Sequence, residues 1–446
     1  MKFLYKWLAL LGFPVILLTA CGPGRKATRK AGTEPTASRY EIRWIQSDTL
    51  LDKSSLRSRL NASEPHIAIN RARPANIVAG SILDNVYFTS DTGRHWQHRH
   101  LTSPLGVYGD PVLMSGTDGT IHYFHLASGR KNGGRWLEAI VLQSSSDGGK
   151  TWTPGMAIGS NLPKQQDKPW PALHTPTGRM AVAWTEFDRY GSKNPGDKSR
   201  ILISFSDDGG KTWTSPVRIN DTDGDCLDDD NTVEGAIPLF DKQGNVFVVW
   251  AFNGKIWFDF STDGGRTWHP DKEIARQEAG WAFDIDGIYR ANGLPQFFKD
   301  INENFYVVFA DKRASTGGDI RLLVSTDHGR HWAEKTLPVA SQRDQFFPAA
   351  TIDTLSNTFQ MLYYDRSQTQ GNTTQVKFLL WPLNENQVQI ITVNRNPFTP
   401  VKFPFFGDYI GIDAYNGLTA LIWTEIRNFG TQVHTVVLEL KEKSNE

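Results

Sequence analysis

The sequence predicts an all-β fold, a β-propeller built from four-stranded blades. Three observations support this prediction. A short motif recurs along the chain, short apolar runs alternate with turns that contain Gly or Asn, and aromatic residues make up 12% of the 446 residues. A supersecondary unit that returns at a regular spacing indicates a repeat architecture, and frequent short strands separated by turn residues favour β-structure.

The recurring motif reads Ser/Thr-x-Asp-x-Gly-x-Thr/His-Trp and returns every 55 to 64 residues. Each residue type has a local structural reason: the Asp can accept hydrogen bonds from backbone N–H groups of a tight turn, the Gly permits a left-handed backbone, and the Trp can fill apolar space between neighbouring sheets. We therefore expect a folding role for these Asp residues rather than a catalytic one. Three copies are complete, at residues 145–152, 206–213 and 261–268. Two diverged copies lie at 89–96 and 325–332.

The motif resembles the Asp-box, or BNR repeat, of the sialidase superfamily of β-propellers. The chain is also similar to bacterial lipoproteins described as sialidase-like, through the segments 64–70, 166–170, 289–295 and 405–409. The resemblance implies a propeller fold. For an enzyme, it implies a glycoside hydrolase of the exo-α-sialidase type, which acts on terminal sugars. Sialidases of this superfamily have six blades.

The blade count is read from the places where an innermost strand is expected to start. Seven segments have this character: 64–67, 109–112, 167–170, 234–237, 293–296, 346–349 and 406–409. The last unit contains only three strands of its own, and residues 40–45 form a spare strand near the N-terminus. A ring closed by this N-terminal strand in the last blade leaves no open sheet edge. Seven blades are therefore favoured, with six as the alternative.

The N-terminus has the pattern of a targeting segment. Lys2 and Lys6 precede an apolar run at 7–18, and the segment 18–22, Leu-Thr-Ala-Cys-Gly, resembles a bacterial lipobox. An ordinary secretory peptide with an incidental Cys is the alternative. The predicted domains are a lipoprotein signal peptide at 1–20, a flexible tether from lipidated Cys21 at 21–39, and a single propeller domain at 40–446. This predicts a lipid-anchored protein of the cell envelope, in the outer membrane of a Gram-negative bacterium.

Charge and cysteine content exclude some classes of protein. The 48 basic and 48 acidic residues balance, which gives no electrostatic reason to expect a nucleic-acid partner. Cys226 is the only cysteine besides Cys21, so a chain lipidated at Cys21 has no intramolecular disulfide.

The propeller topology predicts where polar residues meet. The starts of the first strands, and the turns between the second and third strands, lie on the face opposite the Asp-boxes and surround the central channel. Carboxylates and guanidiniums on one rim favour a polar or anionic sugar ligand, whereas Asp–Arg pairs that hold neighbouring blades together are the alternative. The candidate catalytic residues are Asp167, Asp110, Glu234, Tyr364 and Tyr409. The candidate substrate-binding residues are Arg290, Arg313, Arg366, Asn292, Asp408 and Lys168.

The sialidase resemblance implies roles for some of these residues. Arg290, Arg313 and Arg366 would form the cluster that binds the substrate carboxylate. Tyr364 or Tyr409 would be the nucleophile with Glu234 as its base, and Asp167 or Asp110 would be the acid. However, the Arg-Ile-Pro motif of the family is missing, because the nearest segment, 218–220, reads Arg-Ile-Asn and is misplaced.

One loop is strongly acidic and is the only candidate metal site in the sequence. Oxygen ligands at alternating positions suit Ca²⁺, so a structural Ca²⁺ is predicted here, and no cofactor is required. A solvated acidic loop is the alternative. The candidate ligands are Asp221, Asp223, Asp225, Asp228 and Asp230.

Two classes of function remain open. The first is a cell-envelope lipoprotein that binds a glycan and acts as an exo-glycoside hydrolase on it. The second is a non-catalytic propeller that serves as a subunit or scaffold of an outer-membrane protein assembly.

Overall fold

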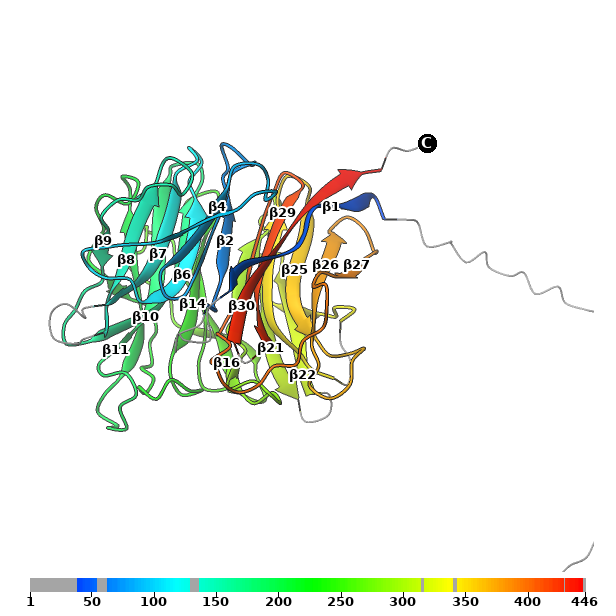
Figure 1. Cartoon of the computed structure of the whole chain (residues 1–446). Helices are drawn as coiled ribbons and strands as arrows, with labels where there is room; N and C mark the ends of the chain where they lie inside the picture. Colours follow the sequence, from blue (N-terminus) through cyan, green and yellow to red (C-terminus); the bar gives the residue numbers. More distant parts are fainter. Residues whose placement is uncertain are drawn as a thin grey trace, which may run out of the picture. The chain divides into compact units, whose positions relative to one another are not determined.

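The computed structural model describes residues 38–53, 62–128, 136–313, 317–339, 343–428 and 430–443. All regular elements of these residues are β-strands, arranged in seven four-stranded sheets and one two-stranded hairpin. The predicted all-β propeller of seven blades is confirmed (Figure 1). The predicted signal peptide, lipidated Cys21 and nearly all of the tether lie outside the described residues. None of the described residues forms a helix with the length and hydropathy of a membrane span.

Each of the first six blades uses four strands that follow one another in the chain, except that the short hairpin of β18 (Ala282–Phe283) and β19 (Ala291–Asn292) precedes the fifth blade. The first two blades contain β2 (His66–Ile69), β3 (Ile77–Ser81), β4 (Asn85–Thr89), β5 (Gln97–His100), β6 (Gly109–Ser115), β7 (Ile121–Ser128), β8 (Trp136–Ser145) and β9 (Met156–Ile158). The third and fourth contain β10 (Gln165–His174), β11 (Arg179–Phe187), β12 (Ser199–Ser206), β13 (Val217–Arg218), β14 (Glu234–Phe240), β15 (Val246–Ala251), β16 (Lys255–Ser261) and β17 (Lys272–Arg276). The fifth and sixth contain β20 (Gln296–Lys299), β21 (Phe305–Arg313), β22 (Gly317–Ser325), β23 (Ala333–Lys335), β24 (Gln345–Asp353), β25 (Thr358–Asp365), β26 (Gln375–Pro382) and β27 (Gln389–Thr392).

The seventh blade joins the two ends of the propeller. It contains β28 (Gly411–Tyr415), β29 (Leu418–Arg427) and β30 (Gly430–Glu442), and its outermost strand is β1 (Tyr40–Lys53). β1 runs antiparallel to β30, and Figure 1 shows the blue N-terminal strand beside the red C-terminal one. The predicted closure by an N-terminal strand is confirmed.

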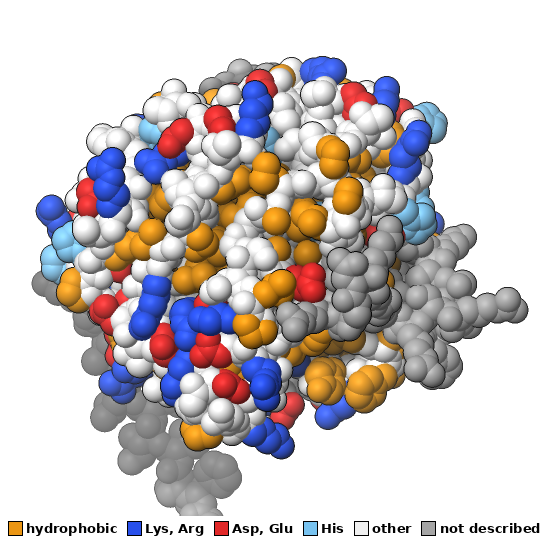
Figure 2. Space-filling view, turned by 90° about the vertical axis from the view of Figure 1, so that its left-hand side faces the viewer, with side chains coloured by type: hydrophobic (Ala, Val, Ile, Leu, Met, Phe, Trp, Pro, Cys, Tyr) orange, Lys and Arg blue, Asp and Glu red, His pale blue; other side chains and the backbone are white. Residues whose placement is uncertain are grey.

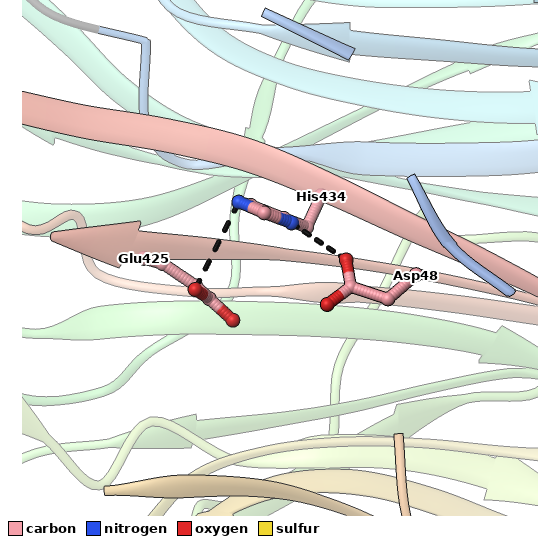
Figure 3. Close-up of side chains that lie close together, drawn as sticks. All are labelled: Asp48, Glu425 and His434. Carbon is pink, nitrogen blue, oxygen red and sulfur yellow. Dashed lines mark hydrogen bonds and ion pairs between the residues drawn. The ribbon is translucent and has the colours of Figure 1, made fainter. Parts of the chain in front are cut away.

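Buried polar side chains connect the three outer strands of this seventh blade. The His434 Nδ1 atom on β30 lies 2.6 Å from Asp48 Oδ1 on β1, and His434 Nε2 lies 3.8 Å from Glu425 Oε2 on β29 (Figure 3). The imidazole also stacks on the indole of Trp423, with 5.9 Å between ring centroids. The closing strand is therefore held by side chains as well as by its backbone ladder.

The hydrophobic core is divided among the junctions between blades. Six main clusters of buried side chains each combine residues from two neighbouring blades. A seventh combines the sixth and seventh blades with the short hairpin and Ala310 of the fifth blade. The cluster between the third and fourth blades, for example, includes Ala183 and Ile203 on one side and Val248 and Trp250 on the other. Hydrophobic side chains also reach the surface: on the side shown in Figure 2 they gather toward the middle, with most charged side chains around them. Each blade therefore depends on both of its neighbours for burial.

The Asp-box turns show the predicted hydrogen bonds. In the second complete copy, Asp208 Oδ1 accepts from the backbone N–H groups of Lys211 (3.0 Å) and Thr212 (2.9 Å), and Oδ2 accepts from the Thr212 hydroxyl (2.6 Å). These bonds, that of the Thr212 hydroxyl foremost, lower the pKa of Asp208 to about 2. In the diverged copies, the rings of His95 and His331 take the place of the hydroxyl. The folding role expected for these Asp residues is supported in all five copies.

The Asp-box Trp residues lie where the motif predicts, although they are only partly buried. The Trp213 side chain packs on the cluster between the second and third blades, and its ring meets that of Phe124 edge-on at 6.2 Å. Its Nε1–H donates to the carbonyl of Gly210 at 3.2 Å. The indole therefore fills a space between sheets while one edge stays in contact with solvent.

The substitution Trp213→Ala is expected to lower the free energy of unfolding by about 2 kcal/mol, less than the loss for a fully buried Trp. The reason is the lost contact between the second and third blades. Chemical denaturation of both proteins measures it. Trp44→Ala is the control, because the Trp44 side chain is 45% exposed. Equal stabilities of wild type and Trp213→Ala would contradict a packing role.

Candidate functional site

A residue in the left-handed backbone region lies near the start of the first strand in several blades. The φ angles are 51° for Glu64, 49° for Asp110, 50° for Lys168 and 48° for Phe347, and a Pro follows each of these residues in the sequence. Three of them lie in blades two, three and six, where the register between the first and second strands is interrupted at this point. Such conformations cost about 1–3 kcal/mol each and gather at functional sites. Their recurrence at one structural position directs attention to that end of the channel.

A small cavity lies at this position. Its volume is about 40 Å³, room for a few water molecules. Its polar lining residues are Asp110, Lys168, Asn292, Gln296, Asp408 and Tyr409. Val112, Trp170 and Ile237 also line the wider channel of about 580 Å³ that the first strands of the blades enclose. The polar groups therefore lie at one end of a channel along the propeller axis.

Asp408 is the centre of a charged network at this cavity. Its carboxylate accepts from Lys168 Nζ at 2.9 Å and from the Arg290 guanidinium at two places, of which the Nε contact measures 3.1 Å. The Arg290 Nη1 atom also contacts Asp228 Oδ2 at 2.5 Å, and the Tyr190 hydroxyl donates to the same oxygen at 2.5 Å. Although burial opposes it, the charges of Arg290 and Lys168 hold the pKa of Asp408 well below its usual value. Both cations are thus already matched by carboxylates.

The other carboxyl groups of the site are shifted in the opposite direction. Burial raises the pKa of Asp110 to about 8, and burial together with the charge of Asp408 raises the pKa of Glu64 to about 7. Burial also raises the pKa values of Asp167 and Glu234 well above the usual range. Carboxyl groups with raised pKa values therefore lie beside Asp408, whose pKa is lowered.

Glu234 shows this most clearly. Its side chain is fully buried, and neither carboxyl oxygen has a hydrogen-bond partner among the described residues. An ionised carboxylate without a partner is strongly disfavoured in such a place, which agrees with a neutral Glu234 and with a site that has more acids than bases.

The structure brings eight of the predicted site residues together. Five of them line the cavity: Asp110, Lys168, Asn292, Asp408 and Tyr409. Asp167, Glu234 and Arg290 interact with these five directly or through their charges. The Tyr409 hydroxyl donates to the Pro111 carbonyl at 3.1 Å, and burial raises the pKa of Tyr409. An activated nucleophile needs the opposite shift, so Tyr409 is suited to binding rather than to attack.

Three other predicted residues have different surroundings. Tyr364 is fully buried in the cluster between the sixth and seventh blades, and its hydroxyl donates to the Thr424 carbonyl at 2.6 Å. Tyr364 is therefore a core residue, because both faces of β25, the second strand of its blade, pack against neighbouring blades. Arg313 pairs with Glu334 at 3.2 Å at the blade edge.

Arg366 also has a partner of its own. Its guanidinium is buried and contacts Asp344 at 3.2 Å and the Thr374 hydroxyl at 3.1 Å. Arg290, Arg313 and Arg366 thus pair with different carboxylates and form no common cluster. The Arg290 pairs cross from one blade to another, as in the alternative hypothesis, whereas Arg313 and Arg366 pair within their own blades.

Glu64 and Tyr190 belong to the site but were absent from the predicted set. Glu64 Oε1 accepts from the backbone N–H of Asp408 at 3.1 Å. An available signal was the acidic or basic residue followed by Pro at the start of a first strand, which Glu64 shares with Asp110 and Lys168. Tyr190 lies after β11 and carried no such signal.

The carboxylates of the acidic loop are held by different donors. Asp223 contacts Arg218 at 3.1 Å, Asp225 accepts from the Thr232 hydroxyl at 3.0 Å, and Asp230 accepts from the backbone N–H of Trp281 at 2.9 Å. Asp228 belongs to the Arg290 network, and Asp221 contacts the backbone N–H of Asp271. Calcium binding by this set of five stays a prediction.

Within the described part of the chain, one group of three side chains offers metal-ligand atoms that all lie within 4.8 Å of one another: Asp48, Glu425 and His434 (Figure 3). Arg427 already pairs with Glu425, at 2.6 Å. We therefore interpret this group as part of the ring closure.

Comparison with known proteins agrees with the repeat and the fold. Residues 259–270 match the family described as BNR/Asp-box repeat. The chain is thus a β-propeller of seven four-stranded sheets in which at least one Asp-box repeat matches a known family. No curated protein has a matching sequence.

Several solved structures resemble this Asp-box propeller. An ulvan lyase of polysaccharide lyase family PL25 has a TM-score of 0.50 and 13% identity, over 84% of this chain and 94% of the other. A protein of unknown function from Dyadobacter fermentans gives 0.49 and 15%, over 90% and 99%. The Hadza microbial sialidase Hz136 gives 0.45 and 13%, over 82% and 73%. At such identities the likeness shows the fold alone.

The raised pKa of Asp110 predicts a pH-dependent stability. Between its usual value of 3.8 and its folded value of about 8, the folded protein binds a proton that the unfolded chain releases. The contribution of Asp110 is therefore complete below pH 3.8 and is lost as the pH rises through 8. Asp110→Asn cannot ionise, so its melting temperature relative to wild type should be higher at pH 8.5 than at pH 5.

Asp208→Asn is the matched control, because the pKa of Asp208 is lowered and its titration ends below pH 5. The difference in melting temperature between Asp208→Asn and wild type should be the same at pH 5 and pH 8.5. A pH-independent difference for Asp110→Asn would contradict a protonated Asp110.

Proposed function

We propose that this Asp-box propeller is a glycan-binding protein whose ligand occupies the channel of about 580 Å³ and meets the polar end formed by Asp110, Lys168 and Asp408. The observation that carries the proposal is a fixed set of hydrogen-bonding groups at this end, beside the aromatic rings of Trp170 and Tyr409, whose centroids lie 5.9 Å apart. Sites for small ligands combine apolar walls with a few fixed polar groups in this way. The similarity of the fold to that of an ulvan lyase, which is a polysaccharide lyase, supports a glycan ligand.

The charges favour a neutral or amino sugar over an acidic one. Lys168 and Arg290 are already paired with Asp408 and Asp228, so a sugar carboxylate would have to compete with a buried carboxylate for them. Asp110 and Glu64, in contrast, offer oxygen atoms to hydroxyl or ammonium groups. A sialic acid is therefore a poorer ligand for this site than a neutral sugar.

Glycoside hydrolysis is the second candidate function, and one observation favours it. The raised pKa of Asp110 and the lowered pKa of Asp408 give a proton donor and an ionised carboxylate at one site. This separation of pKa values is the arrangement that glycosidases need. Asp110 would protonate the leaving oxygen, and Asp408 would stabilise the positive charge that develops on the sugar.

The targeting pattern supports a proposal about location. The protein is anchored to the envelope through lipid on Cys21, with 21–39 as its tether, in the outer membrane of a Gram-negative bacterium. A non-catalytic role as a subunit of an outer-membrane protein assembly is the alternative function, and it is compatible with the same anchor. The balanced charge gives no reason to propose nucleic acid as a partner.

Cells that express the protein and receive a fatty-acid analogue should incorporate the label into it, because the lipobox pattern directs acylation to the Cys thiol. Cys21→Ala should abolish the label. Cys226→Ala should retain it, because Cys226 is buried in the fold. Label on the Cys21→Ala protein would contradict the anchor.

The glycan proposal is tested with an array of neutral, amino and sialylated oligosaccharides. Wild type should bind neutral or amino glycans better than sialylated ones. Lys168→Met should lose at least tenfold in affinity, about 1.4 kcal/mol. Lys164→Met should not, because Lys164 pairs with Glu186 and Asp188 outside the cavity.

The same proteins separate binding from hydrolysis. Asp110→Asn should still bind but should no longer release product from chromogenic glycosides if Asp110 is the proton donor. A wild-type protein that binds none of the glycans would overturn the proposal, and preferential binding of sialylated glycans would overturn the charge argument.

A further inference from the structure

A second group of carboxylates lies away from the channel, on the fourth blade. The last residue pairs between β16 and β17 are Trp257↔Glu273 and Phe258↔Lys272. Continuing this register by one residue along both strands places Asp259 opposite Asp271. Residues directly opposite each other on antiparallel strands have Cβ atoms about 4.5–5.5 Å apart. The two carboxylates therefore share one face of the sheet at its edge.

This face points toward the third blade. Side chains alternate along a strand, so Asp259 has the same direction as Trp257, which packs against the cluster between the third and fourth blades. Phe258 has the other direction and belongs to the cluster with the fifth blade.

The third blade contributes a carboxylate to the same place. The Asp221 backbone N–H donates to Asp271 Oδ2 at 2.8 Å, and the Asp271 backbone N–H donates to Asp221 Oδ2 at 2.9 Å. These reciprocal bonds connect the loop after β13 to the start of β17. They fix one oxygen of each carboxylate and leave the other oxygen available.

Two of the remaining oxygens lack any partner. Asp259 Oδ2 and Asp271 Oδ1 are buried and accept no hydrogen bond from any described residue, and the Asp259 side chain is 1% exposed. A buried carboxylate oxygen without a donor is costly, so a proton or a cation is needed there.

The neighbouring cation is engaged elsewhere. Arg218 donates to the backbone carbonyls of Asn220 and Asp221 and pairs with Asp223 at 3.1 Å. The nearby His269 ring stacks on Phe260 at 4.0 Å. The free oxygens are therefore not matched by either basic side chain.

We propose that Asp221, Asp259 and Asp271 bind one Ca²⁺ ion that joins the third and fourth blades. Three carboxylates without nitrogen or sulfur donors suit a hard cation. Ca²⁺ accepts irregular geometry and completes its shell with water and backbone carbonyls, whereas Mg²⁺ demands a near-ideal octahedron. This ligand set shares only Asp221 with the acidic-loop set.

The set differs in two ways from the Asp48, Glu425 and His434 group. The ligand atoms of Asp48, Glu425 and His434 all lie within 4.8 Å of one another, whereas those of the proposed calcium site do not. Ion binding must therefore draw Asp221, Asp259 and Asp271 closer together. The proposed calcium site also has buried oxygens that no guanidinium contacts, whereas Glu425 is paired with Arg427.

Terbium luminescence and thermal unfolding of the full chain, stripped with EDTA, test the proposal. Trp268, three residues before Asp271, can sensitise bound Tb³⁺. Wild type should show luminescence that Ca²⁺ displaces, and millimolar Ca²⁺ should raise the melting temperature. Asp259→Asn and Asp271→Asn should each weaken binding at least tenfold. Asp225→Asn, in the acidic loop, should bind as wild type does.

Three results would overturn the proposal. The first is a wild type without Tb³⁺ or Ca²⁺ response, which would indicate that Asp259 and Asp271 share a proton. The second is loss of binding in Asp225→Asn with retention in Asp271→Asn, which would assign the ion to the acidic loop. The third is unchanged binding in both Asn variants. If Asp259→Asn fails to fold, Asp271→Asn and Asp221→Asn decide the question.

Discussion

Closure of the ring is the constraint on which the rest of this structure depends. Each sheet is buried on both faces by its neighbours, so a gap anywhere would expose two hydrophobic faces. The gap is closed by β1, which the chain supplies from its N-terminal end to pair with β30. Asp48 and His434 add a buried side-chain contact across the same pair of strands. The channel has its shape because this closure places the seven first strands around one axis.

The sequence was sufficient for the parts of the fold that depend on local chemistry. An Asp-box needs particular residue types at fixed offsets, so the turns were recognisable even where His95 replaces Thr. The topology then placed the starts of the first strands together, which is why Asp110, Lys168 and Asp408 were predicted to meet. Side-chain direction was not accessible in this way. Tyr364 follows the alternation of its strand into the core, and Arg366 turns to Asp344, because packing around each side chain decides its direction.

The charge balance of the channel end shows why the fold does not carry an activity with it. Asp408 takes both cations, Lys168 and Arg290, and so removes them from recognition of an acidic ligand. Burial raises the pKa values of the carboxyl groups of Asp110 and Glu234. With an uncharged residue in place of Asp408, the same turns and blades would leave both cations free for an acidic ligand. Under the proposed function, the pairing within the rim rather than the Asp-box scaffold would therefore set the ligand class.

The strained residues give the last step of this argument. Asp110 and Lys168 keep left-handed backbones before a Pro, with φ near 50°, although such a conformation is unfavourable for a side chain larger than Gly. The first strands hold it in place because each is anchored on both sides by the packed junctions between blades. Glu64, at the start of the first blade, has the same conformation and accepts a hydrogen bond from Asp408 in the last blade. This bond holds the backbone of Asp408 across the junction between the last and first blades, so the geometry of the site depends on the completeness of the ring.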